Sequence, residues 1–87
     1  MNKRIKVILE YMEELNPDAM KIDGFDDCII GICTSFKGST LLYSENKVIR
    51  KLMKDMSEDE AWEYYDYNIL EAYMSPYRPV FSKEIPF

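Results

Sequence analysis

The chain has 87 residues, of which 47% are hydrophobic and 14% aromatic, and its formal net charge at pH 7 is −5. This length suits one small domain over residues 1–87, and the hydrophobic content favours a folded core over a disordered tail. The acidic balance disfavours direct binding to nucleic acid, whose phosphates need clustered lysines and arginines. A homodimer interface would supplement the modest core of so short a chain.

The first predicted element is an amphipathic helix over residues 3–15. Apolar side chains recur there at the spacing of one helical face, at Ile5, Ile8, Leu9, Met12 and Leu15. Pro17 ends this helix because the residue before a proline is driven out of the helical conformation. The aspartates of residues 17–27 lack the spacing of a calcium loop, so we assign them to turns and predict no metal site.

A β-hairpin is predicted next, with strands over residues 28–36 and 40–43. Both runs are rich in apolar and β-branched residues, and a turn around Gly38 separates them. Gly31 in the first strand indicates a bulge or a close approach by another element. Cys28 and Cys33 are five positions apart in this run, so on one strand they face opposite sides and are expected to be buried free thiols.

Two more helices are predicted, over about residues 45–55 and 58–74. Ser44 is placed to cap the first helix, and Ser57 with Glu60 fits a capping box for the second. The apolar face of the second helix consists of Ala61, Trp62, Tyr65, Ile69, Ala72 and Tyr73. Residues 77–81 are extended by their prolines and suit an edge strand along the hairpin. The predicted fold class is therefore α+β.

The two later helices differ in charge. Residues 37–56 contain five lysines and arginines against two carboxylates, whereas residues 57–74 contain six carboxylates and no basic residue. At a rise of ~1.5 Å per residue these carboxylates spread over about 20 Å, long enough to engage a basic groove. They are Glu58, Asp59, Glu60, Glu63, Asp66 and Glu71. An ordinary solvated helix face explains them equally well.

A second set of residues suggests a ligand pocket. Tyr64 and Asn68 lie four positions apart at the edge of the apolar face of the acidic helix. Aromatic rings there could stack a base while Lys47, Arg50 and Lys51 of the basic helix meet phosphates, above all across a dimer. Packing of Tyr64 and Asn68 within the fold, and solvation of the basic face, are the alternatives.

The absence of histidine removes most familiar catalytic machinery. It excludes the commonest general base, the Ser–His and Cys–His pairs and nearly all catalytic zinc sites. The three glycines are isolated, so there is no phosphate loop. No apolar run reaches the ~18 residues of a membrane span, and no secretory signal is recognisable. We therefore expect a cytoplasmic protein that is not an enzyme, uses no cofactor and acts by binding.

Five stretches of the chain, taken in order, form a recognisable combination. They are Asp-Gly-Phe-Asp-Asp-Cys-Ile-Ile-Gly at 23–31, Met-Ser-Glu-Asp-Glu-Ala at 56–61, Tyr-Asn-Ile at 67–69, Ala-Tyr at 72–73 and Pro-Val-Phe at 79–81. Together they resemble a group of small acidic proteins of unassigned function that bacteriophages and prophages encode. The resemblance spans residues 18–81 and implies a phage origin and action in the host cytoplasm, without implying a mechanism.

Two functional hypotheses follow from this resemblance and the charge pattern. The first is an inhibitor of a host defence protein, such as a CRISPR effector, because small phage inhibitors often present carboxylates where DNA phosphates would lie. The second is a module that sequesters a nucleotide signal of host defence.

Overall fold

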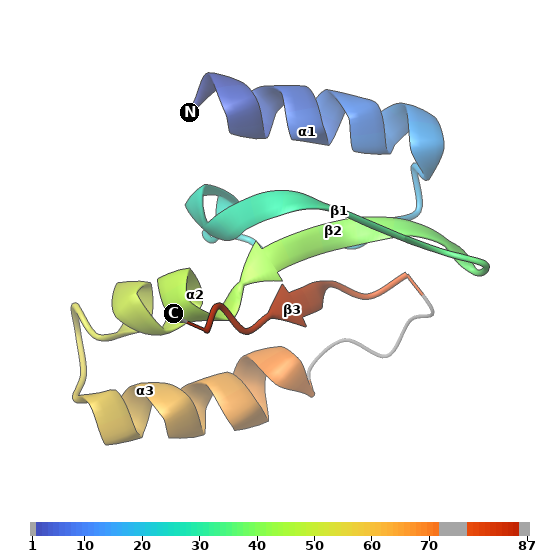
Figure 1. The fold of residues 1–87 in the computed structure, drawn as a ribbon. Coiled ribbons are helices and arrows are strands. Elements are labelled where there is room, and N and C mark those ends of the chain that lie inside the picture. Colours follow the sequence, from blue (N-terminus) through green and yellow to red (C-terminus); the bar gives the residue numbers. More distant parts are fainter. Residues whose placement is uncertain (1, 72–76, 86–87) are drawn as a thin grey trace.

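The computed structural model describes residues 2–71 and 77–85, and its elements run along the chain as shown in Figure 1. They are α1 (Lys3–Leu15), the 3-10 turn η1 (Asp26–Cys28), β1 (Ile29–Ser35), β2 (Gly38–Ser44), α2 (Glu45–Leu52), α3 (Glu58–Tyr64), the π-helical segment η2 (Tyr65–Leu70) and β3 (Val80–Ser82). The predicted α+β class and the order of its elements are confirmed. In the described part of the chain, no helix has the length and apolarity that crossing a bilayer requires.

The hairpin forms the centre of the fold. β1 and β2 pair antiparallel, and their register shifts between Ile29 and Gly31, which confirms the irregularity predicted at this glycine. The strand bounds differ from the predicted 28–36 and 40–43, because the turn consists of Phe36 and Lys37 alone and β2 begins at Gly38. The φ of Gly38 is +127°, in the region that favours glycine.

The prediction that both cysteine thiols are free is confirmed, but the prediction that both are buried on one strand is wrong. Cys28 is buried in η1, just before the strand, whereas Cys33 is only half-buried in β1.

β3 completes the sheet in the order β1-β2-β3, so that β2 is the central strand. Leu42 pairs with Val80 and Ser44 with Ser82, and the two strands are parallel. A parallel neighbour requires a long crossover, which the chain supplies through α2, α3 and η2 before it returns. The edge strand expected over residues 77–81 is confirmed in part: Val80 and Phe81 pair with β2, the strand continues to Ser82, and residues 77–79 are not part of it.

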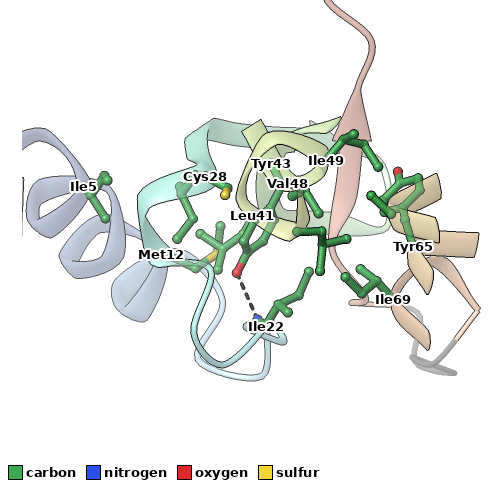
Figure 2. Close-up of a cluster of buried hydrophobic side chains, with 13 residues drawn as sticks. Ile5, Met12, Ile22, Cys28, Leu41, Tyr43, Val48, Ile49, Tyr65 and Ile69 are labelled. Carbon is green, nitrogen blue, oxygen red and sulfur yellow. Dashed lines mark hydrogen bonds between the residues drawn. The ribbon is translucent and has the colours of Figure 1, made fainter. Parts of the chain in front are cut away.

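The helices pack on the strands around one cluster of buried side chains. Figure 1 shows α1 on one side of the hairpin and α3 with η2 on the side of β3. Tyr43 is fully buried at the centre, where its hydroxyl accepts a hydrogen bond of 2.9 Å from the backbone N–H of Ile22 (Figure 2). The buried apolar residues are Ile5, Met12, Ile22, Cys28, Ile29, Leu41, Tyr43, Val48, Ile49, Leu52, Ala61, Tyr65 and Ile69.

The second and third helices differ in detail from their prediction. α2 ends at Leu52, three residues before the expected end at 55, and turns cover residues 53–55. The segment expected as one helix over 58–74 is α-helical only to Tyr64 and continues as η2 to Leu70, while residues 72–74 lie outside the described residues. Both predicted caps are present: Ser44 accepts from the N–H of Lys47, and Ser57 and Glu60 form the capping box.

The change of helix type has a physical reason in the spacing of the buried residues. Ala61, Tyr65 and Ile69 are buried and follow one another at intervals of four. Such a spacing drifts by about 40° per step on an α-helix, which has 3.6 residues per turn. In η2 the hydrogen bonds join residues five apart and the turn is wider, so the rotation per step of four residues changes sign and all three side chains stay on the buried side of the segment.

Candidate functional site

The six carboxylates of the predicted partner surface all lie exposed on α3, η2 and the residue after it. We call Glu58, Asp59, Glu60, Glu63, Asp66 and Glu71 the acidic surface. The ion pairs among the described residues are Lys21 with Asp26, Lys51 with Asp27 and Lys83 with Glu45. Within that part of the chain, therefore, no carboxylate of the acidic surface has a cation partner.

The acidic surface extends around the helix rather than along one stripe. Glu60 and Glu63 line a shallow hollow together with Tyr64, Tyr67 and Asn68. Asp66 and Glu71 line a larger cavity, described below. Tyr64 and Tyr67 are both exposed, so the first of these hollows presents aromatic rings together with carboxylates.

The basic residues expected to meet phosphates lie elsewhere. Lys47, Arg50 and Lys51 line a hollow beside η1. The ammonium of Lys51 donates to Asp27 Oδ1 at 2.8 Å, and this hydrogen bond holds the pKa of the Asp27 carboxyl below its usual value. These cations and the Tyr64–Asn68 pair thus line different hollows, so a ligand touching both groups would have to extend from one to the other or bind across a dimer.

A cavity of about 960 Å³ lies between η2 and the segment containing β3, and we call it the Glu45 cavity. Glu45, the first residue of α2, lines it and is only 6% exposed. The hydroxyl of Tyr65 donates to Glu45 Oε2 at 2.9 Å, and the ammonium of Lys83 donates to Oε1 at 3.0 Å. Both oxygens of this buried carboxylate are therefore bonded, as burial of a charge requires.

The environment of Tyr65 follows from its place in this network. Its ring is buried and meets Trp62 and Phe81 edge-on, with centroids 5.9 and 5.3 Å away. Burial raises the pKa of the Tyr65 hydroxyl, and its hydrogen bond to the Glu45 carboxylate raises this pKa further. Tyr65 thus remains a neutral donor to Glu45 under ordinary conditions.

Glu45 and Lys83 were missed as candidates from the sequence. A glutamate in the first turn of a helix is expected on dipole grounds alone, so nothing local distinguishes Glu45 from a solvated carboxylate. Its partner Lys83 is 38 positions away. The following residue, Glu84, bonds the Ser44 hydroxyl through its side chain and Asn46 through its backbone carbonyl, so the segment after β3 is tied to the start of α2.

No match to this chain was found among protein-family models, curated protein sequences or solved structures. Over the described ranges, no three side chains of the metal-ligating types gather closely enough to hold a metal ion.

Proposed function

We propose that this protein acts by binding, and that its acidic surface docks on a basic groove of a host defence protein, such as a CRISPR effector, and blocks it. The observation that supports this proposal is the set of six exposed carboxylates without a cation partner among the described residues. The resemblance to phage and prophage proteins supports a host protein as the partner.

The charges of α1 and of the acidic surface differ, and this difference favours a binding role for the acidic surface over a merely solvated helix face. α1 carries Lys3, Arg4 and Lys6 as well as three glutamates, so its exposed charges balance. Neighbouring like charges on a helix destabilise it slightly, and the acidic surface has no such balance. The exposed rings of Tyr64 and Tyr67 add to the case because tyrosine is enriched at protein interfaces.

Charge reversal at Asp59 and Glu63 tests the proposal. These residues are exposed, lie one helical turn apart and make no described side-chain contact, whereas Glu60 accepts a hydrogen bond in the capping box. We expect the Asp59→Lys/Glu63→Lys variant to lose capture of the purified defence protein and to lose protection of phage in a plating assay. Capture by the unmodified protein should also weaken as salt rises, because exposed charges are screened.

The matched control is Glu10→Lys/Glu14→Lys on α1. Glu10 and Glu14 are also exposed and four positions apart, so this variant has the same change in net charge on another helix. Capture that survives reversal at Asp59 and Glu63, or that falls equally in the control, would refute docking through the acidic surface.

The second candidate is the module that sequesters a nucleotide signal. The observation in its favour is that Trp62 and Arg78 line the same 960 Å³ cavity, so that one ring and one guanidinium face a space of ligand size. Native mass spectrometry of protein purified from infected cells should then show a nucleotide-sized adduct. Its consistent absence would count against this candidate.

A further inference from the structure

The Glu45 cavity already contains a cation, which the chain itself supplies. The ammonium of Lys83 donates to Glu45 Oε1 at 3.0 Å and lies 5.7 Å from the centroid of the Trp62 ring. A carboxylate on one side and an aromatic face on the other are the two groups that recognise an ammonium or a guanidinium. The residues around Lys83 therefore have the chemistry of a binding site for a basic side chain.

Lys83 is held there weakly. Its side chain is 74% exposed, whereas that of Glu45 is 8% exposed. The solvated ammonium of Lys83 can exchange this ion pair for hydration by water, and the long lysine side chain regains rotational freedom when it leaves. The Glu45 carboxylate, in contrast, cannot leave the cavity and needs a cation at Oε1. Exchange of Lys83 for another cation therefore costs little, provided that a cation takes its place.

The remaining walls favour a cation over an anion. With Lys83 turned out to solvent, the cavity lining has three carboxylates, from Glu45, Asp66 and Glu71, against the single guanidinium of Arg78. Asp66 and Glu71 also belong to the acidic surface, so the cavity opens directly onto it. A basic segment lying on the acidic surface would thus have this cavity within reach of its side chains.

We propose that the Glu45 cavity binds a lysine or arginine side chain of the partner protein, which displaces Lys83 from Glu45 and Trp62. In naming a protein as the source of that side chain, this inference rests on the proposed function. Lys83 keeps the carboxylate paired until the partner arrives. The cavity thereby supplies a specific contact within an otherwise diffuse electrostatic surface.

Trp62 makes the site directly observable because it is the single tryptophan of the chain. The probe is a tri-lysine peptide, acetylated and amidated at its ends, titrated while the fluorescence of Trp62 is followed. Lys83→Met removes the ammonium that competes with the peptide for Glu45. The peptide Kd should therefore fall by about two- to fivefold, the range expected when a weak ion pair no longer has to be broken. Glu45→Gln should abolish the fluorescence change in both backgrounds.

Lys6→Met is the matched control, since Lys6 is exposed on α1 and its loss changes the net charge equally. An equal gain in Lys83→Met and Lys6→Met, or no gain in Lys83→Met, would overturn the proposal. If Glu45→Gln does not fold, Asp66→Asn/Glu71→Gln tests the same charge with exposed residues and should weaken binding. A fluorescence change with ATP and none with tri-lysine would show a nucleotide site instead.

Failure of the cavity proposal can be distinguished from failure of docking through the acidic surface. Asp59 and Glu63 do not line the Glu45 cavity, so Asp59→Lys/Glu63→Lys should still bind tri-lysine with a Trp62 signal. If that variant loses partner capture and Lys83→Met alone leaves the tri-lysine Kd unchanged, the acidic surface stands as a hypothesis and the cavity is rejected. The reverse pattern would reject the acidic surface and retain the cavity.

Discussion

α1 and the segment formed by α3 and η2 both bury one apolar face in the same core, yet their outer faces differ. α1 contributes Ile5 and Met12 to the core, and its exposed side carries both signs of charge. The α3–η2 segment contributes Ala61, Tyr65 and Ile69, and the charged side chains that it exposes are all carboxylates. Packing constrains the inner face of a helix and leaves the outer face free, so packing does not require the unbalanced charge of α3–η2, of which Glu60 alone takes part in the capping box.

The largest expected effects come from the buried isoleucines of the two regions. Ile5→Ala under α1 and Ile69→Ala under η2 should each lower the free energy of unfolding by about 2–5 kcal/mol, because each leaves a cavity in the shared core. Urea unfolding followed by circular dichroism measures both. A negligible cost for Ile5→Ala beside a large one for Ile69→Ala would show that α1 is not an equal part of the core.

Tyr65→Phe should have the next largest effect, and α1 has no counterpart to it among the described residues. The substitution leaves Oε2 of the buried Glu45 carboxylate without its donor, which costs about 1–3 kcal/mol in unfolding free energy. Urea unfolding at neutral pH gives the value. An unchanged midpoint would contradict the network as described.

Ionisation of Tyr65 should make the free energy of unfolding decrease at high pH. Its pKa in the folded protein is raised above the ordinary value of 10.0, so the unfolded chain loses this proton first as pH rises. The stabilisation is fully present below pH 10.0 and declines as pH increases beyond it. Wild-type unfolding free energy should therefore fall more steeply above this pH than that of Tyr65→Phe. Parallel curves for the two proteins would argue against a raised pKa.

The helix caps should give a smaller difference. The N–H of Glu60 donates to Ser57 Oγ at 3.3 Å and the N–H of Ser57 donates to Glu60 Oε1 at 3.3 Å. Ser57→Ala should cost about 1 kcal/mol in unfolding free energy. The double variant Ser57→Ala/Glu60→Ala removes both bonds and should cost more than Asn2→Ala at the start of α1, which removes the one bond from the N–H of Arg4. If Ser57→Ala and the double variant cost the same in urea unfolding, the second bond of the capping box adds nothing.

The last comparison concerns thiol reactivity, which reports on local opening of the core beside α1 and leaves the free energy of unfolding unchanged. Figure 2 shows Cys28 in the part of the core near Met12, and burial raises the pKa of its thiol from 9.0 to about 11. In Cys33→Ser at pH 8, Cys28 should react with a disulfide reagent at least about a hundredfold more slowly in the folded protein than in urea, since only the thiolate reacts. Similar rates in both conditions would show that the core beside α1 opens often enough in the folded protein to expose Cys28 to the reagent.

Much of the fold could be read from short-range signals. The apolar spacing of residues 3–15, the turn at Gly38 and the caps at Ser44 and Ser57 each involve residues within a few positions of one another, and the structure has all of them. The positions of the acidic residues on the outer side of the third helix were predicted in the same way. Whether those residues bind a partner stays a prediction, because exposure is shared by functional and merely solvated carboxylates.

The amino-acid sequence by itself therefore determined the helices, the hairpin, their caps and the charge of each helical face, because these depend on neighbours along the chain. Only the tertiary structure decided that β3 runs parallel to β2, that the third helix widens into η2 and that Glu45 is buried beneath Lys83. Those features depend on residues such as Glu45 and Lys83, which are 38 positions apart and meet only when the whole chain packs. The acidic surface was visible from the sequence, whereas the cavity that opens onto it was not.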